Sequence, residues 1–248
     1  MDYIRCGESY EICLTNRIRT TLSVEPLALY TVLRQINPAP RSVYLHCPDF
    51  SVLSSSPEKF FSVGRNAVVE AKPIKGTRKR GATAQQDAAL IEDLANSEKD
   101  QAENLMIVDL LRNDISRVAK VGSVKVPKLF AVETYATLHQ MVSTVVGDLV
   151  DPPSMSGVME ALFPCGSITG APKIRAMQII DELEPTRRAL YCGSLLYLDV
   201  RGEMDSSIAI RSLLAKDGQI SCWGGGGIVA DSEWQAEYQE SITKVKVL

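Results

Sequence analysis

A single lysine is the first candidate for chemistry in this sequence. Lys75 lies in the stretch AKPIKGTRKRG (71–81), two residues after Pro73, and three more cations follow at positions 78–80. A short basic run is typical of a solvated loop, whereas a lysine amine held neutral in a pocket can act as a nucleophile. The stretch therefore leaves three interpretations open: a surface charge, part of a phosphate or nucleic-acid patch, or a nucleophile.

Carboxylates recur at helical spacing in two other places. Near the C-terminus, intervals of four, three and four residues separate Glu233, Glu237, Glu240 and Lys244, which places them on one face of a predicted helix. A second pair, Asp100 and Glu103, lies one turn apart on another predicted helix. A solvated acidic face is the simpler interpretation of this spacing. If the two faces meet, their carboxylates form an all-oxygen site suited to Mg²⁺.

Two further stretches could bind an anion through main-chain groups. The four glycines at 224–227 are poor for a strand interior, and they either allow a ligand to approach bare N–H groups or form a bulge or tight turn. The loop GSITGAPK (166–173) precedes a predicted helix, so it is an anion site or an ordinary N-cap. It is not a P-loop, because the Gly-x₄-Gly-Lys-[Ser/Thr] order is absent. Together the features suggest a small anionic substrate, a divalent cation and a lysine.

The elements that must position these residues come in groups. The chain start predicts a helix, a strand and a helix over 25–37, and four short runs between 41 and 74 predict a strand meander. Ser97 and Asp100 match a capping box at the start of a long helix. Asp217-Gly218 between two strand-like runs predicts a hairpin. Because strands arrive in consecutive runs with helices between the groups, we expect an α+β fold with mostly antiparallel sheet.

Composition narrows the class of protein. The 248 residues are 45% hydrophobic and 23% charged with a net charge of −3, which predicts a globular chain with a sizeable core and no general affinity for nucleic acid. The six cysteines form no C-x-x-C pair, so we expect reduced thiols in a reducing compartment. No apolar run approaches the roughly 20 residues that cross a bilayer, and the first residues do not form a signal peptide. We therefore expect no membrane partner and a cytoplasmic location, or a plastid one if the native chain is longer.

Several separate blocks of the sequence resemble the signature blocks of chorismate-utilising enzymes. In family order they are PIKGT, AENLMIVDLLRND, GSVKVP, GSITGAPKIRAM, DSSIAIRS and GGGIVADS, and the resemblance runs from about residue 3 to the end. It implies an α+β chorismate-binding fold with mostly antiparallel sheets packed as a β-sandwich and flanked by helices. Family chains are usually longer. Residues 1–248 are therefore expected to be one chorismate-binding domain, the C-terminal catalytic region, with the N-terminal part of the fold absent.

Two positions distinguish among the reactions of this family. Lys75 in PIKGT resembles members that aminate chorismate at C4, whereas anthranilate-forming members have alanine there. Isochorismate-forming members carry a water-activating lysine at the position of Glu11. The resemblance thus implies formation of 4-amino-4-deoxychorismate for para-aminobenzoate and folate, with ammonia from a glutamine amidotransferase subunit or domain. Anthranilate formation and a truncated, non-catalytic chorismate-binding domain are the alternatives. Arg78, Lys79 and Arg80 are expected to be solvated charges.

The resemblance also assigns catalytic roles. Lys75 attacks C2 of chorismate as the 4-hydroxyl leaves, Glu58 in SSPEKF acts as general acid and base, and ammonia then adds at C4 and expels the lysine. An amine must be neutral to attack, so Lys75 needs a lowered pKa, from burial or a nearby cation.

Binding roles follow from the same blocks. Mg²⁺ grips the ring carboxylate of chorismate, and its expected ligands are Glu103 and Glu240, with Glu237 and Asp100 nearby. The substrate-binding positions are Thr169, Gly170, Tyr191, Arg211, Gly225, Gly226, Gly227 and Lys244. A histidine that many relatives carry before LVS is Gln140 here, with His139 one residue earlier, and the role of this pair stays open. By spacing alone, His139 is expected to be structural.

Overall fold

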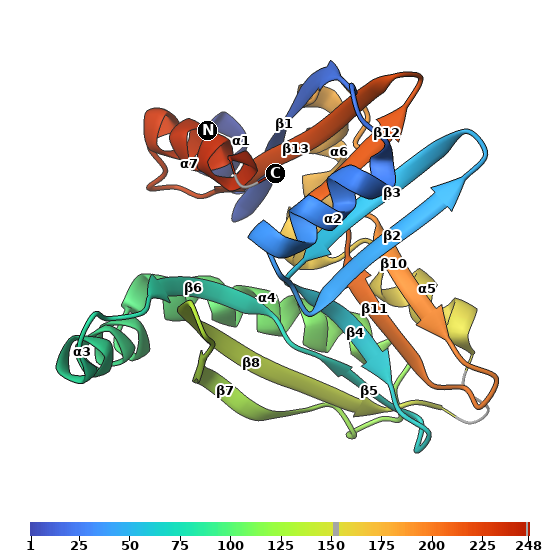
Figure 1. The fold of residues 1–248 in the computed structure, drawn as a ribbon. Helices are drawn as coiled ribbons and strands as arrows, with labels where there is room; N and C mark the ends of the chain where they lie inside the picture. The colour runs from blue at the N-terminus through green and yellow to red at the C-terminus, as the bar shows by residue number, and fades with distance from the viewer. Residues whose placement is uncertain (151–153, 247) are drawn as a thin grey trace. The chain divides into compact units, whose positions relative to one another are not determined.

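The computed structural model describes residues 1–150, 154–246 and 248, and the chain divides into two compact units (Figure 1). Unit 1 comprises Met1–Lys59, Pro164–Leu196 and Ser206–Leu248, and unit 2 comprises Phe60–Phe163 and Tyr197–Asp205. The expectation of one domain over the whole chain stays a prediction.

Unit 1 contains a six-stranded antiparallel sheet in the order β2-β3-β12-β13-β1-β9. Its strands are β1 (Glu11–Thr21), β2 (Arg41–Cys47), β3 (Phe50–Ser56), β9 (Gly170–Ala171), β12 (Ser212–Lys216) and β13 (Gln219–Ile228). The β1–β13 ladder runs without a register shift from Ile12 opposite Ile228 to Thr21 opposite Gln219 (Figure 1). The two longest strands of this sheet therefore come from opposite ends of the chain.

Helices cover this sheet and hold its core. They are α1 (Asp2–Arg5), α2 (Pro26–Ile36), the 3₁₀ turn η1 (Gly166–Ile168), α6 (Lys173–Leu183) and α7 (Trp234–Val245). Pro26 suits the first turn of α2, because proline has no N–H that the turn would leave unpaired. Leu33 of α2 packs in a buried cluster with Leu53 and Leu213 of the sheet. Burying such side chains is the main favourable contribution to folding.

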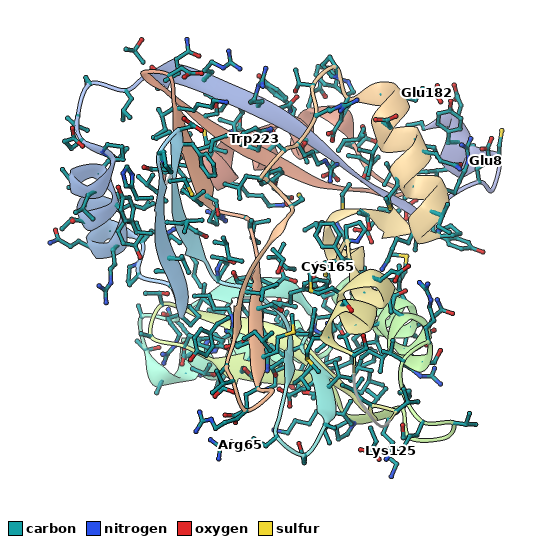
Figure 2. All side chains as sticks on the ribbon, turned by 90° about the vertical axis from the view of Figure 1, so that its right-hand side faces the viewer. Glu8, Arg65, Lys125, Cys165, Glu182 and Trp223 are labelled. Atoms are coloured by element: carbon teal, nitrogen blue, oxygen red, sulfur yellow. The ribbon has the colours of Figure 1, made fainter. Side chains whose placement is uncertain are left out.

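Helix α1 is tied to α6 by polar contacts at the surface of unit 1. Glu8 and Glu182 both lie on this side of the unit (Figure 2). Arg175 of α6 forms an ion pair with Glu8, and its guanidinium lies 5.3 Å from the centre of the Tyr3 ring. The Tyr3 hydroxyl donates to Glu182 Oε1 at 2.5 Å. These contacts fix the short segment that leads into β1.

Unit 2 holds most of a seven-stranded sheet in the order β10-β11-β4-β5-β8-β6, with β7 also pairing with β8. Its strands are β4 (Lys59–Val63), β5 (Val68–Ala71), β6 (Ile74–Lys79), β7 (Lys125–Thr134), β8 (Leu138–Asp148), β10 (Ser194–Leu198) and β11 (Met204–Ile208). The β4–β5, β5–β8, β6–β8 and β7–β8 ladders are antiparallel. Its helices are α3 (Ala84–Ala95), α4 (Glu98–Ser116) and α5 (Met155–Leu162). Helix α4 lies along β6 and β8 (Figure 1) and buries Ile107, Leu111 and Ile115.

The local predictions from sequence are largely confirmed. The α+β class, the antiparallel sheets and the helix over 25–37 are present, and Ser97 Oγ accepts a hydrogen bond from the Asp100 N–H at 3.3 Å. Asp217 and Gly218 both have positive φ, 51° and 69°, as a type I′ hairpin turn requires. None of the described helices combines the length and apolar character needed to span a bilayer, and all six cysteines are free thiols.

The predicted meander over 41–74 is confirmed for the β2–β3 and β4–β5 pairs but is wrong as one continuous sheet. β2 and β3 belong to the first sheet, whereas β4 and β5 belong to the second. Strand β3 pairs on its other side with β12, whose residues lie about 160 positions further along the chain. Hydrophobic alternation identifies a strand but does not name its partner, so adjacency in sequence was mistaken for adjacency in the sheet.

Candidate active site

Strand β6 and helix α4 bring Lys75 and Glu103 together in unit 2. Lys75 Nζ lies 3.8 Å from Glu103 Oε2, and the lysine side chain is only 16% exposed. Lys99, one turn earlier on α4, reaches Glu103 Oε1 at 4.0 Å. The predicted nucleophile is therefore mostly buried beside a predicted metal ligand, and a surface charge is no longer an adequate description of it.

A bulge in β6 aims this part of the strand at α4. Gly76 has a φ of 77°, and the register against β8 shifts between Lys75 and Thr77. A Cβ at Gly76 would lie 2.8 Å from the Asp100 carboxyl carbon, so only glycine lets the strand approach Asp100 this closely. Bulges commonly redirect side chains next to functional sites. Asp100, Glu103 and Lys75 consequently lie around one short segment of backbone.

In the basic run after Lys75, Lys79 and Arg80 are exposed as expected, whereas Arg78 is half-buried; both arginines form ion pairs. Arg78 Nε donates to Asp93 Oδ2 at 2.6 Å, and its Nη2 donates to Asp100 Oδ2 at 3.1 Å. Arg80 donates to both carboxylate oxygens of Asp87. The hydrogen bond from Arg80 is the main reason that the pKa of Asp87 is held well below its usual range. These pairs attach β6 to α3 and α4.

His139 takes part in the same structural network. Its ring is fully buried, with Nδ1 2.9 Å from the Thr134 hydroxyl and Nε2 2.9 Å from Asp87 Oδ1. Both ring nitrogens are thus engaged, which agrees with a structural role. Gln140 lies opposite Thr77 in the β6–β8 ladder, one register position from Lys75 and Met141.

In unit 1 the glycine run lies inside a regular strand, which contradicts both the bulge and the tight turn. Gly224–Gly227 belong to β13 and pair with β1 in unbroken register. Added Cβ atoms would lie 2.4 Å from Ser241 O at Gly224, 2.2 Å from Leu14 O at Gly225 and 2.1 Å from Glu11 Oε1 at Gly227. Close packing, which a side chain would prevent, therefore explains three of the four glycines.

Gly226 differs from its neighbours because its open side faces charged groups of α7. The nearest atoms to a Cβ there would be Glu237 Oε2 at 3.2 Å, Lys244 Nζ at 3.7 Å and Glu240 Oε1 at 3.8 Å. Lys244 Nζ lies 2.6 Å from Glu240 Oε1 and donates to the Gly225 carbonyl at 2.9 Å. The predicted helix face of α7 thus meets the glycine run, as the substrate-binding assignment requires.

Among the described strands, only β1 pairs with β13 at these glycines, so the other edge of β13 carries no second strand there. Strand β12 pairs with β13 only from Gln219 to Cys222, and β1 is the described strand that pairs with the glycines. In an antiparallel ladder alternate residues direct their N–H groups to opposite edges. Some glycine N–H groups therefore point away from β1, where an anion could accept their hydrogen bonds.

The loop before α6 contacts the predicted general acid and base. Ser167 Oγ donates to Glu58 Oε1 at 3.1 Å. Thr169 is buried, and its hydroxyl donates to the Cys165 carbonyl at 3.0 Å, inside its own turn. Gly170 has a φ of 134°, and a Cβ there would lie 2.0 Å from a backbone oxygen of β1. The loop is thus packed on β1, with Ser167 as its link to Glu58.

Tyr191 and Arg211 are close enough to interact. Tyr191 is buried and stacks on Trp223 with ring centres 5.8 Å apart (Trp223 is labelled in Figure 2). Burial raises the pKa of the Tyr191 hydroxyl above its ordinary value. Burial also lowers the pKa of Arg211, and Tyr191 partly opposes that change. Both predicted substrate contacts therefore lie in one partly desolvated region of unit 1.

Sequence reasoning missed Arg188, which ties this region together. Its guanidinium donates to both oxygens of Glu184, to the Ile168 carbonyl at 2.7 Å and to the Cys13 carbonyl at 2.6 Å. Burial is the largest single influence and lowers the pKa of Arg188, but the hydrogen bonds to Glu184 together with the charges of Cys192, Glu184 and Cys13 outweigh it, so the pKa is raised. Pro185 interrupts the helical pattern before Arg188, which hid the pairing with Glu184 in the sequence.

The four predicted metal ligands are divided between the units. Asp100 and Glu103 lie in unit 2, whereas Glu237 and Glu240 lie in unit 1. Within the described part of the chain, no three His, Cys, Asp or Glu side chains gather into a ready metal site. Carboxylate oxygens are nevertheless the ligands that Mg²⁺ prefers. The carboxylates of Glu103 and Glu240 each already form an ion pair with a lysine, so both lie next to a positive charge. The chemical type of these four side chains therefore suits Mg²⁺.

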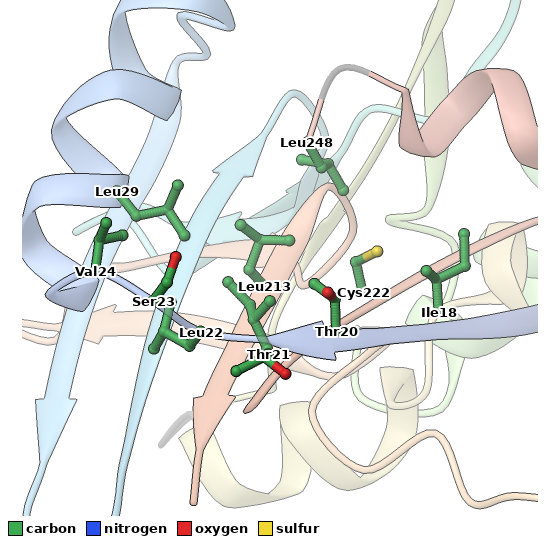
Figure 3. A pocket seen from close by; sticks show the side chains of 11 residues that line it. Ile18, Thr20, Thr21, Leu22, Ser23, Val24, Leu29, Leu213, Cys222 and Leu248 are labelled. Carbon is green, nitrogen blue, oxygen red and sulfur yellow. The ribbon is translucent and has the colours of Figure 1, made fainter. Parts of the chain in front are cut away.

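A pocket of about 310 Å³ lies at the other end of β1 from Glu11 (Figure 3). Aliphatic side chains such as Leu29, Leu213 and Ile220 line it, together with Thr20 and Thr21. None of the predicted catalytic, substrate-binding or metal-binding residues belongs to its lining. It therefore adds nothing to the candidate site.

Comparison with known proteins establishes the class. A model of the chorismate binding enzyme family matches residues 1–248, and the chain belongs to that family. It is 50% identical to aminodeoxychorismate synthase component 1 of Escherichia coli (strain K12), covering 98% of this chain and 54% of that protein. It is 50% identical to aminodeoxychorismate synthase of Streptomyces pristinaespiralis, covering 97% of this chain and 33% of that protein. The chain spans about half the length of such relatives, or less.

A solved structure agrees with the fold. Anthranilate synthase component I from Streptococcus pneumoniae TIGR4 superposes with a TM-score of 0.90 at 38% identity, covering 99% of this chain and 54% of that one. The expected chorismate-binding fold is thereby confirmed.

Proposed function

We propose that this chain carries the catalytic residues of an enzyme that aminates chorismate at C4, giving 4-amino-4-deoxychorismate for the para-aminobenzoate and folate route. The observation that carries the proposal is the placement of Lys75, mostly buried at a strand bulge and 3.8 Å from Glu103. The names of the relatives at 50% identity support the same reaction.

In the proposed reaction the neutral Lys75 amine attacks C2 of chorismate, both ring double bonds shift (C1=C2 to C1=C6 and C5=C6 to C4=C5) and the C4–O bond breaks. Glu58 gives a proton to the departing hydroxyl, which leaves as water, and Lys75 is left as a secondary ammonium bonded to C2. Ammonia then attacks C4, both ring double bonds return to their original positions and the C2–N bond breaks, releasing the neutral lysine. The new ammonium at C4 returns a proton to Glu58. Dividing the substitution into two steps is nucleophilic catalysis.

Other residues hold the substrate. The edge of β13 that faces away from β1 near Gly226 and the Lys244 ammonium suit a carboxylate of chorismate, and Arg211 with Tyr191 suits the enolpyruvyl side. Asp100, Glu103, Glu237 and Glu240 are the proposed residues to hold Mg²⁺. When bound, the ion supplies a positive charge that neutralises and orients the ring carboxylate.

Ammonia is proposed to come from a glutamine amidotransferase subunit or domain. The name "component 1" of the E. coli relative implies that it works with another component. Two plant relatives, from Oryza sativa subsp. japonica and Arabidopsis thaliana, are named chloroplastic, so a plastid location is the alternative to the proposed cytoplasmic one.

Product analysis tests the proposal. The chain is incubated with chorismate, Mg²⁺ and an ammonium salt, and the products are separated by chromatography. We expect 4-amino-4-deoxychorismate, and anthranilate in its place would show the alternative reaction, which is kept open by a 44% identical anthranilate synthase component 1 of Aquifex aeolicus (strain VF5). Chorismate binding without any turnover, even with the amidotransferase added, would favour a non-catalytic domain.

Mass spectrometry of the intact protein tests the covalent step. An adduct of chorismate is expected on the wild-type chain and absent from Lys75→Ala. Lys79→Ala is the matched control, because Lys79 is an exposed lysine of the same strand. An adduct that persists in Lys75→Ala removes Lys75 from its proposed role.

A further inference from the structure

A fully buried asparagine connects the helix that carries Glu103 to the strand that carries Lys75. Asn104 follows Glu103 on α4 and has no exposed surface. Its Nδ2 donates to the Pro73 carbonyl at 3.5 Å, two residues before Lys75. Its Oδ1 accepts from the Ser143 hydroxyl at 2.5 Å. A buried polar side chain that satisfies both ends of its amide fixes the groups it joins.

Ser143 of β8 completes the link. Its N–H donates to the same Pro73 carbonyl at 3.2 Å, so this one oxygen accepts hydrogen bonds from both β8 and α4. The Ser143 hydroxyl also accepts from the Phe130 N–H at 3.0 Å, at a residue of β7 whose φ is 55°. The network therefore joins α4, strands β7 and β8, and Pro73, the residue just before β6.

The position of this network matters for the candidate site. On the far side of Lys75, Gly76 packs against Asp100 and Arg78 bonds to it, so that flank of β6 is also attached to α4. Lys75 thus lies between two attachments of its strand to the helix. Asn104 is the attachment on the Pro73 side.

We propose that Asn104 is a positioning residue that holds the Lys75 amine next to the Glu103 carboxylate; this rests on the proposed function. Asn104 does not touch the substrate in this scheme. It acts through the Pro73 carbonyl and through its neighbour Glu103. Substitution should therefore slow formation of the lysine adduct more than it weakens binding of chorismate.

The test compares Asn104→Ala and the milder Ser143→Ala with the wild-type chain and with Ile115→Ala. Ile115 is buried further along α4, so its substitution lowers the melting temperature without loosening β6. We expect the adduct rate to fall at least tenfold in Asn104→Ala and less in Ser143→Ala, while KM for chorismate changes less than twofold. Ile115→Ala should retain the adduct rate. If folded Asn104→Ala forms the adduct as fast as the wild-type chain, the inference is overturned. If Asn104→Ala does not fold, an unchanged adduct rate in Ser143→Ala overturns it instead.

A second readout separates this inference from the proposed function. Reductive methylation of Lys75 in the absence of chorismate is measured by peptide mass spectrometry relative to the exposed Lys120. We expect the relative rate at Lys75 to rise at least threefold in Asn104→Ala and Ser143→Ala but not in Ile115→Ala. If the wild-type chain forms no adduct, the proposed function fails, and an unchanged methylation rate in both network variants overturns the role of Asn104 independently.

Discussion

Lys75 and Glu103 form an ion pair between a strand and a helix of unit 2, with Nζ and Oε2 3.8 Å apart. A carboxylate at this distance favours the charged form of an amine. The same pair that holds the lysine in place therefore opposes its use as a nucleophile. Whatever neutralises Glu103 should favour the reactive form of Lys75.

The first prediction concerns the charge on Glu103. In Glu103→Gln, loss of the negative charge should lower the pH at which Lys75 becomes half-reactive. Reductive methylation of Lys75 across pH 6–11 measures this midpoint. Glu240→Gln is the control, because Glu240 pairs with Lys244 in the other unit. An unchanged midpoint in Glu103→Gln would mean that the ion pair has little influence on the amine.

The second prediction separates two neighbouring glycines of β13. A Cβ at Gly225 would meet a backbone oxygen at 2.2 Å, whereas one at Gly226 meets only the end of the Glu237 side chain at 3.2 Å. Urea unfolding should show that Gly225→Ala loses about 1–3 kcal/mol or more, and that Gly226→Ala loses less than about 1 kcal/mol. Gly226→Ala should instead weaken chorismate binding, as isothermal titration can show. Equal losses of stability would contradict the packing argument.

The third prediction concerns Asp87 and acid. Arg80, then the Gly81 N–H and His139, hold the pKa of Asp87 below its ordinary value. A lowered carboxyl pKa contributes stability that is fully present above about pH 4, the unfolded value, and is lost as the pH falls through the folded value. The difference in melting temperature between wild type and Asp87→Asn should therefore stay constant from pH 7 to 5 and shrink below pH 4. A difference that grows on acidification would show the opposite sign.

The fourth prediction concerns the thiols. Burial raises the pKa of Cys165 and of Cys192 to about 12, far above an ordinary thiol, so almost no thiolate is present at pH 8. Cys6, in contrast, is exposed. Iodoacetamide at pH 8 should label Cys6 within minutes and leave Cys165 and Cys192 unlabelled until the chain is unfolded in urea. Rapid labelling of Cys165 in the folded chain would show that its region opens.

Local elements could be predicted from sequence because their signals are local. The capping box at Ser97 and the turn at Asp217-Gly218 involve residues within three positions of each other, and both are present. Strand partners could not be predicted in the same way. Strands β3 and β12 pair although about 160 positions separate them in the sequence, and the residues of neither strand identify its partner.

The candidate site shows the same division. The helical spacing of Glu237, Glu240 and Lys244 placed them on one face, and the structure brings that face to Gly226. The glycine run was misjudged because propensity disfavours glycine in strands, whereas close packing against Glu11 and Ser241 requires it. Asn104 and Arg188 were missed because their partners are backbone carbonyls distant in sequence, which leave no pattern in the residue types.

The long β1–β13 ladder also constrains the order in which parts of the chain can fold. Residues that pair in it are about 200 positions apart, so the pairing closes a very long loop, which is slow and late in folding. On the ribosome, β1 emerges about 200 residues before β13, its partner in the sheet, so until then that edge of β1 can pair with other chains. Residues 60–163 of unit 2, by contrast, are contiguous and emerge together. Synthesis of unit 1 therefore carries the greater risk of aggregation, and that risk ends only when the glycine strand has been translated.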